Sequence, residues 1–343
     1  MIQRPSVSAG ALAIVAAVAL TMTTATADAQ STEAFAGKTV RVIIGYGPGG
    51  GFDQWGRLVA RHIGAHLPGN PTVVPENMPG GGSLVAANYI YSIAPKDGTA
   101  MAIIVRDAPL GPLTGAAGAR FDATKMSWIG TPAMDTGVCI ANSTADVKTA
   151  EDLFTKQLIL GDGGEGGGTH TYPAALASLL GMKFKLISGF PSAAEILLAM
   201  DRGEVDGICE SLDSVTRERP DWISSGKVHV LFQGGLAPNP DLKGVPFVRD
   251  FAHNEEDKQA INFLYAGEGI GRPFVAPPDL PPDRLEMLRE AFDATMKDPD
   301  FIADAKKQKL DLSPESGADL AALIDKIYAT PKPIVEKIGR LIQ

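Results

Sequence analysis

The feature that most constrains the fold of this chain is a regular alternation of short apolar runs with helical segments. The run at 40–44 is continuously apolar, as in a buried strand, and 54–67 places its apolar residues on one helical face. Predicted strands at 72–74 and 101–105 follow, separated by a predicted helix at 83–94. This order predicts a parallel sheet with crossover helices.

A second α/β set follows between residues 138 and 232. The tail after Pro238 contains several helical segments but only one predicted strand, near 273–276, so it cannot build a sheet of its own. The economical arrangement is two lobes with a cleft between them, in which the C-terminal segment returns to cover the first sheet. We predict that 30–136 and 237–343 form the first lobe and 137–236 the second.

The first 29 residues have the three parts of a secretory signal peptide. Arg4 provides a basic start, residues 11–20 are apolar, and Ala27-Asp28-Ala29 has the small-x-small pattern of a cleavage site. A membrane anchor is the alternative, but a span needs about twenty apolar residues and this run has about ten. We therefore expect cleavage near Ala29 and an exported protein without routine access to NAD or ATP.

Charge and cysteine content exclude several classes of function. The chain carries a formal net charge of −9 and has no cluster of lysine and arginine, so it offers nucleic-acid phosphates no counter-charge. Its two cysteines, Cys139 and Cys209, are too few for a disulfide scaffold and lack the spacing of metal ligands. Two buried thiols and a single disulfide both remain open.

A glycine-rich loop follows the first predicted strand. Gly45-x-Gly47-x-x-Gly50 satisfies the dinucleotide fingerprint, but Pro48 lacks an amide for a pyrophosphate and no acidic residue stands about 20 positions on. We reject a nucleotide and expect no cofactor. Glycines here allow a ligand to approach the backbone, and the amides of the next helix favour an anion; a tight turn without a ligand is the alternative. Asp53 is predicted as the helix N-cap.

Two further loops repeat this arrangement. Residues 77–83 are glycine-rich and end at Ser83, a predicted N-cap, and residues 161–170 contain six glycines before Thr169. The two predicted lobes thus each present a glycine-rich loop at the start of a helix. If the loops face one cleft, a small anion such as a carboxylate is held from both sides by backbone amides and helix dipoles.

Three ordered motifs between Lys38 and Ile104 carry a family resemblance. They are RVIIGYGPGGGFDQWGRLVARHI, VVPENMPGGGSLVAANYI and APKDGTAMAII. They resemble the PGGGxD, ENRPGAGG and PDGYT segments of the substrate-binding receptors of tripartite tricarboxylate transporters, the Bug or TctC type of periplasmic solute-binding proteins. The resemblance continues more weakly to the C-terminus, through PFVAPPDLPPDRLEMLREAF.

The resemblance implies a type II-like periplasmic binding protein: two α/β lobes, each a mostly parallel sheet flanked by helices, which close on a small organic acid. It implies a monomer in the periplasm that delivers its ligand to the membrane permease subunits, without enzymatic activity. A periplasmic sensor that acts on a signalling receptor, and an exported hydrolase using Thr169 or His170, are the alternatives. By position, ligand contacts are assigned to Pro48, Gly50, Gly51 and Asp53, to Gly80, Gly81 and Gly82, and to Gly168 and Thr169.

The chain departs from the family pattern in two places. Tyr172 stands where the family usually has a histidine, and Gly189-Phe190-Pro191-Ser192 replaces P-Y-K-G, which removes a tyrosine hydroxyl and a lysine. The pocket is therefore less basic on that side. Aromatic or less charged acids are favoured over a citrate-like ligand.

Several other residues are candidates for the cleft. Arg106 and Asp107 follow the third predicted strand, at the end where α/β proteins bind ligands. Arg106 either pairs with a ligand carboxylate or forms a salt bridge with Asp107 or a surface contact. His170 either reaches the cleft or makes a hydrogen bond within its loop.

The remaining candidates also have two interpretations each. Glu210 either meets a ligand hydroxyl or amine or makes a structural bond, and Tyr46 and Phe190 either sandwich a planar ligand or belong to the core. His62 and His66 have i,i+4 spacing but no third ligand, so we interpret them as a solvated helix face and expect no metal. No motif of a nucleophile or of paired catalytic carboxylates is present.

Overall fold

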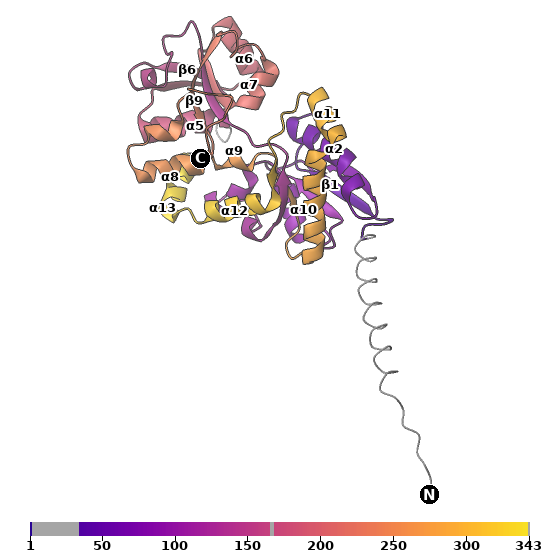
Figure 1. Cartoon of the computed structure of the whole chain (residues 1–343). Helices are drawn as coiled ribbons and strands as arrows, with labels where there is room; N and C mark the ends of the chain where they lie inside the picture. Colours follow the sequence, from indigo (N-terminus) through magenta and orange to yellow (C-terminus); the bar gives the residue numbers. More distant parts are fainter. Residues whose placement is uncertain (2–33, 165–167, 342–343) are drawn as a thin grey trace.

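The computed structural model describes residue 1 and residues 34–164 and 168–341, which form two α/β lobes, each built on its own sheet (Figure 1). The predicted signal peptide, residues 1–29, falls outside the described residues except for Met1. None of the helices in the described ranges is long and apolar enough to cross a membrane.

The first sheet confirms the predicted strand–helix alternation. Its order is β11-β4-β10-β3-β1-β2. β1 pairs in parallel with both β2 and β3, and β10 enters from the C-terminal part of the chain and pairs antiparallel with β3 and β4. The strands are β1 (Thr39–Ile44), β2 (Thr72–Asn77), β3 (Ala100–Ile103), β4 (Ser127–Thr131), β10 (Phe274–Ala276) and β11 (Glu315–Ser316).

The second sheet repeats this plan in the order β7-β6-β8-β5-β9. β6 pairs in parallel with β7 and β8, whereas β5 pairs antiparallel with β8 and β9. Both sheets are thus mixed, where the sequence predicted mostly parallel pairing. The reason is that each sheet accepts a strand delivered by a crossing between the lobes. The strands are β5 (Gly137–Asn142), β6 (Leu158–Asp162), β7 (Phe184–Ser188), β8 (Gly207–Ser211) and β9 (Val228–Gly234).

Helices cover the sheets and begin at the carboxyl ends of the parallel strands. In the first lobe these are α2 (Gly51–His62), α3 (Leu84–Ser92) and α4 (Gly111–Thr114); in the second, α5 (Gly168–Leu180), α6 (Ala193–Arg202) and α7 (Leu212–Glu218). Short 3₁₀ helices are η1 (Ile63–His66), η2 (Ala108–Leu110), η3 (Ala123–Lys125), η4 (Glu151–Phe154) and η5 (Val248–Phe251).

The C-terminal helices divide between the lobes. α10 (Pro282–Lys297) and α12 (Gly317–Tyr328) pack on β4, and α11 (Pro299–Lys307) packs on α2, as expected for a segment that covers the first sheet. α8 (Glu255–Leu264) and α13 (Lys332–Leu341) instead contact each other and α5 (Figure 1). α9 (Ala266–Ile270) lies between α8 and β10 in the chain. α13 also contacts α4 of the first lobe, so within the predicted first-lobe range 237–343 this helix lies at the junction of the two lobes.

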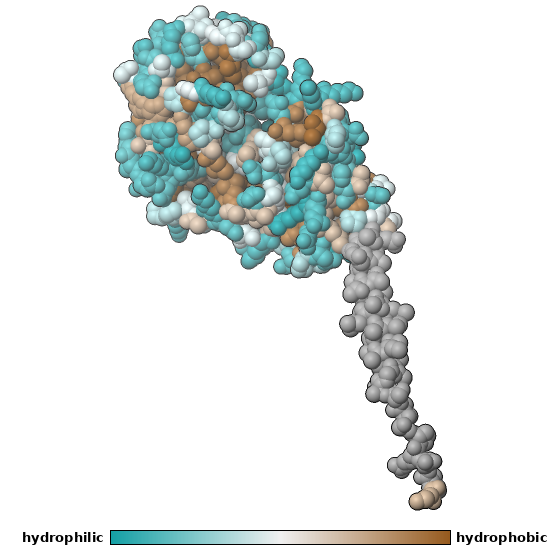
Figure 2. All heavy atoms as spheres, viewed as in Figure 1, coloured by the Kyte–Doolittle hydropathy of each residue, from teal (hydrophilic) through white to brown (hydrophobic). Residues whose placement is uncertain are grey.

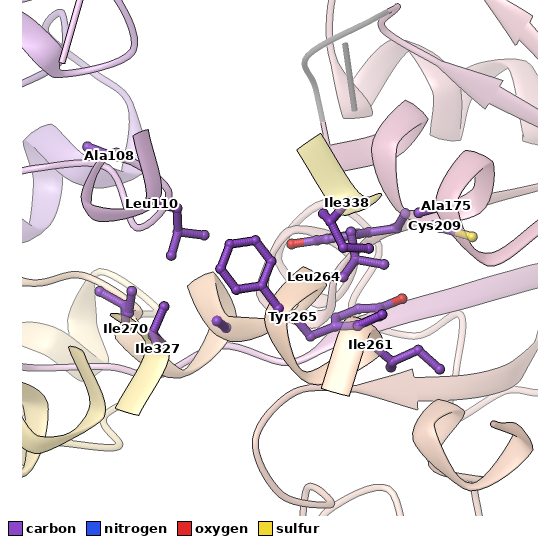
Figure 3. Packing of buried hydrophobic residues seen from close by; sticks show 14 of the residues in the cluster. Ala108, Leu110, Ala175, Cys209, Ile261, Leu264, Tyr265, Ile270, Ile327 and Ile338 are labelled. Atoms are coloured by element: carbon purple, nitrogen blue, oxygen red, sulfur yellow. The ribbon is translucent and has the colours of Figure 1, made fainter. Parts of the chain in front are cut away.

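One apolar core runs through the junction of the lobes. Ala108 and Leu110 come from the first lobe, and Leu264, Tyr265 and Ile338 from the C-terminal helices (Figure 3). Ile338 and its neighbours are buried because α13 is apolar along one face. Figure 2 shows a mainly hydrophilic surface with separate hydrophobic patches, one of them at this junction. The lobes therefore share part of their core.

A disulfide crosses the second sheet. Cys139 in β5 and Cys209 in β8 are direct partners in the antiparallel register and are bonded to each other. Both cysteines are buried. Of the two states that the sequence left open, the structure has the disulfide, which fits an oxidising compartment.

Candidate functional site

A cavity of about 370 Å³ lies where loops of both lobes meet. Its walls come from the carboxyl ends of β1, β2 and β3, from the first turns of α5, and from α8 and α13, as expected for a ligand site in an open α/β sheet. Six predicted site residues line it: Tyr46, Gly81, Gly82, Asp107, Gly168 and Tyr172.

Other hollows lie elsewhere, and two of them are lined by residues near the junction of the elements described above. One of about 660 Å³ lies beside α2 and α7, lined by Trp55, Asp213 and Arg272 among others. Another of about 510 Å³ is lined by residues of α8 and α12. Neither is lined by a residue of the three glycine loops. The smaller cavity is therefore the candidate site, because glycine loops from two lobes converge on it.

The first glycine loop is exposed and contributes Tyr46 alone to the cavity. Pro48 and Gly50 are exposed, Gly51 opens α2, and none of the three lines the cavity. Tyr46 stacks on Phe52, with ring centroids 5.5 Å apart. Of the predicted pair Tyr46 and Phe190, only Tyr46 lines the cavity.

Asp53 holds this loop to the sheet. It lies in the first turn of α2 rather than at the N-cap, which is Gly50. Its carboxylate accepts hydrogen bonds from the Gly49 amide (2.9 Å), Arg57 Nε (2.9 Å) and Asn77 Nδ2 (2.8 Å). Burial opposes the charged form, yet these bonds outweigh it and lower the pKa of Asp53. The carboxylate is occupied and lies outside the cavity lining.

The second glycine loop has a left-handed backbone immediately before α3. φ is positive at Gly80, Gly81 and Gly82 and reaches 69° at Ser83. The buried Ser83 hydroxyl does not cap α3: it donates to the Gly45 carbonyl and accepts from the Val105 amide, both at 3.0 Å. One side chain thus joins the ends of β1 and β3 to the start of α3, a role that the sequence prediction missed.

The third loop is organised around Asp162, which is buried at the end of β6. Asp162 accepts hydrogen bonds from the Gly164 amide and the Ser188 hydroxyl, and it lies 3.1 Å from His170 Nδ1. Thr169 Oγ1 accepts from the Gly163 amide at 3.1 Å. His170 therefore makes the local contact that was its alternative interpretation. Residues 165–167 of this predicted loop fall outside the described residues.

Arg106 is held by acidic residues of the crossing segments, and not by Asp107. Its Nη1 lies 2.8 Å from Asp135 Oδ2 and 3.4 Å from Glu268 Oε2. Arg272 Nη2 lies 3.3 Å from Asp135 and 3.5 Å from Asp213. Burial by itself would raise the pKa of Asp135. The charges of Arg106 and Arg272 and the hydrogen bond from the Ser211 hydroxyl outweigh this effect, so the pKa of Asp135 is lowered. Sequence reasoning missed Asp135, Glu268 and Arg272, which no motif marks.

Glu268 links this cluster to the second lobe. It is completely buried in α9, and its Oε1 accepts a 2.6 Å hydrogen bond from the Tyr172 hydroxyl. Among the described residues its Oε2 has no hydrogen-bond partner. Burial raises the pKa of Glu268 to about 7, against the opposing charge of Arg106. The Tyr172 ring stacks on Tyr265, with centroids 4.6 Å apart.

The remaining predicted residues lie near the cavity or apart from it. Glu210 accepts from the Ser211 amide at 2.9 Å, and burial raises the pKa of Glu210. Phe190 is partly buried against an apolar cluster of the second lobe that includes Ile196 and Ile208. It does not line the cavity. The predicted solvated face at His62 and His66 is partly buried, because these histidines contact Asp304 (3.2 Å) and Asp298 (2.9 Å). Within the described residues no group of side chains could hold a metal ion.

Comparison with known proteins identifies the fold. No protein-family model and no curated protein matches the chain. A TctC solute-binding protein from Polaromonas, solved without ligand, is 21% identical with a TM-score of 0.68 over 87% of this chain and 98% of its own. MatC from Rhodopseudomonas palustris with bound malate is 19% identical with a TM-score of 0.59 over 87% and 99%. An R. palustris protein with adipate is 16% identical with a TM-score of 0.59 over 88% and 97%. The chain thus has the two-lobe fold of TctC-type periplasmic binding proteins.

Proposed function

We propose that this protein is an extracytoplasmic solute-binding protein of the TctC type. It captures a small organic acid between its lobes and delivers it, without turnover, to the membrane subunits of a tripartite tricarboxylate-type transporter. The observation that carries the proposal is the cavity on which Gly81 and Gly82 of one lobe and Gly168 of the other converge. The proteins with malate and adipate share this fold, which supports a carboxylate as the ligand class.

The walls favour recognition of a carboxylate by backbone groups. α3 begins just after Gly82 and α5 begins at Gly168. The first four amides of a helix lack intrahelical partners, and the helix dipole makes that end favourable for negative charge. Of the described residues that line the cavity, none is a lysine or an arginine. The proposed ligand carboxylate is therefore bound by amides of both loops and not by an ion pair.

Ligand binding across two lobes also provides the signal for delivery. The chain passes between the sheets directly from β4 to β5, and it returns from β9 to β10 through a longer segment that contains α8 and α9. A ligand that contacts both lobes stabilises the closed arrangement by its differential contacts, and a membrane partner then recognises the closed surface. The proposed lobes are 30–136 with 237–343, and 137–236.

A thermal-shift screen of the mature protein tests the ligand class. The panel contains malate, adipate, citrate, benzoate and other mono-, di- and tricarboxylates. We expect a dissociation constant on the order of micromolar. A hundredfold excess of ligand over that constant stabilises the folded state by about 2.7 kcal/mol, which raises Tm by roughly 5 °C.

Two variants on α5 locate the site. Gly168→Val places a branched side chain in the cavity and is expected to abolish the shift. Ser178→Val changes an exposed residue of the same helix that does not line the cavity, and it should bind like the wild type. A panel in which no acid shifts Tm would refute the carboxylate class, and equal loss of binding in both variants would refute this location.

A further inference from the structure

Asp107 is the one carboxylate in the cavity lining among the described residues, and it has no partner there. Its side chain makes no hydrogen bond to the turn that follows it. It is exposed to the cavity, yet the surrounding walls partly desolvate it, which raises the pKa of Asp107 while the charge of Arg106 opposes that shift. An acidic group therefore faces the ligand space, and no lysine or arginine is among the described residues that line it.

The basic residues nearby are already engaged. Arg106 contacts Asp135 and Glu268, and Arg272 contacts Asp135 and Asp213. His170, next to the cavity-lining Thr171, lies against Asp162. Among the described residues no arginine or lysine lines the cavity, so a ligand consisting only of carboxylates would bring further negative charge toward Asp107.

The backbone seats the Asp107 carboxylate in a defined place. A Cβ added to Gly267 would lie 2.2 Å from Asp107 Oδ1 and 3.5 Å from Arg106 Cγ. Only a glycine therefore permits the carboxylate to lie against α9. This close packing holds the group at the wall of the cavity.

The other walls of the cavity are apolar or made of glycine. Backbone lines one part of the cavity, at Gly81, Gly82 and Gly168. Apolar side chains from η2, α8 and α13 line another part of the cavity: Leu110, Phe263, Leu264 and Ile338. Figure 3 shows Leu110 on one side of the junction and Leu264 and Ile338 on the other. The cavity thus offers amides for an anion, a carboxylate for a cation, and a hydrophobic wall.

From this arrangement we propose that Asp107 binds an ammonium group of the ligand, so that the site selects acids that also carry an amine and an apolar body, the chemistry of an apolar amino acid. The inference rests on the proposed function and narrows its ligand class. The ligand carboxylate contacts the glycine loops, the ammonium contacts Asp107, and the apolar part packs against α8 and α13. At about 370 Å³ the cavity is near the lower end of the usual range for small-molecule sites, about 300–1,000 Å³.

The test compares pairs of acids that differ only in the amine. Isothermal titration at pH 7.5 measures L-phenylalanine against 3-phenylpropanoate and L-leucine against 4-methylpentanoate. We expect the wild type to bind the amine-bearing member of a pair at least tenfold more tightly. Asp107→Asn should reduce that preference to less than threefold, because it removes the charge and keeps the shape.

The control is Asp146→Asn, at an exposed aspartate of the second lobe, which should keep the wild-type preference. The inference is overturned if the wild type binds the desamino acid as tightly or more tightly, if Asp107→Asn leaves the preference unchanged, or if only plain acids such as malate and adipate bind. In each of these results the proposed function still stands. If no acid of any kind binds, the proposed function fails as well.

Discussion

At the scale of single residues, the buried polar groups around the cavity hold the loops in place more than they offer themselves to a ligand. Each of three such groups makes at least two hydrogen bonds to neighbouring segments. Asp53 and Asp162 accept theirs, and the Ser83 hydroxyl donates one and accepts one. Gly45 illustrates how close this packing is, since a Cβ there would lie 2.5 Å from Ser83 Oγ. Such groups fix the backbone around the candidate site.

The Ser83 hydroxyl provides the test at this scale. Ser83→Ala leaves the Gly45 carbonyl and the Val105 amide without their partner in a buried place. We expect a loss of about 1–3 kcal/mol in the free energy of unfolding, measured by urea denaturation. Ser178→Ala, at an exposed serine, is the control. A change below about 0.5 kcal/mol for Ser83→Ala, the usual range of a surface substitution, would show that the hydroxyl is not holding the loops together.

At the scale of secondary-structure elements, the second sheet depends on a strand delivered from the first lobe. β5 follows the first crossing directly and lies between β8 and β9. Cys139 and Cys209 bond β5 to β8, and 70 residues separate them in sequence. Their disulfide therefore fastens the crossing strand into the sheet that it completes.

Removal of this disulfide tests that role. In the chain-entropy account, a bond that closes a long loop stabilises the folded state mainly by restricting the unfolded chain, typically by 2–4 kcal/mol. The Cys139→Ala, Cys209→Ala double variant should lose about that much, seen as a lower urea midpoint. Reductant added to the unfolding titration should lower the midpoint of the wild type and leave the double variant unchanged. An equal midpoint for both proteins in the absence of reductant would contradict the prediction.

At the scale of the whole molecule, the junction of the lobes contains a buried ion cluster beside an apolar core. Asp135 in the first crossing and Glu268 in the second contact Arg106 of the first lobe. Ser211 and Tyr172 of the second lobe donate to the same two carboxyl groups. The two lobes and both crossings thus meet in one network, so the protonation of Glu268 affects the molecule as a unit.

Glu268 makes stability depend on pH. Burial raises its pKa in the folded protein from an ordinary 4.5 to about 7, so the folded state binds this proton more tightly than the unfolded state. The stability that the proton contributes is complete below pH 4.5 and is lost as the pH rises through 7. Between pH 5.5 and 8.5 we expect a loss on the order of 2 kcal/mol from this group.

Urea unfolding across that pH range checks the prediction. Glu268→Gln keeps an oxygen that accepts from the Tyr172 hydroxyl and removes the proton equilibrium, so its stability should fall less with pH than that of the wild type. Glu290→Gln, at an exposed glutamate of α10, should follow the wild type. Parallel pH profiles for wild type and Glu268→Gln would mean that Glu268 does not titrate in this range.

Much of the architecture was predictable because it depends on local pattern. Apolar runs predicted β1, β3 and the α/β alternation, and glycine clusters predicted three loops, each of which contributes at least one residue to the cavity lining. The pairing of Cys139 with Cys209 was one of two states left open, because it depends on register between strands far apart in the chain. The mixed pairing of both sheets was not predicted for the same reason.

By itself, the sequence determined where backbone lines the cavity: glycines before α3 and α5 are a property of short segments, and their neighbours in the chain suffice to identify them. Tertiary structure alone decided which charges remain free. Arg106 contacts Asp135 and Glu268 rather than the adjacent Asp107, because the crossings bring those carboxylates beside it. Electrostatic partners are chosen by distance in space and by burial, and a linear pattern carries neither. Asp107, left without a partner, is therefore a consequence of the fold.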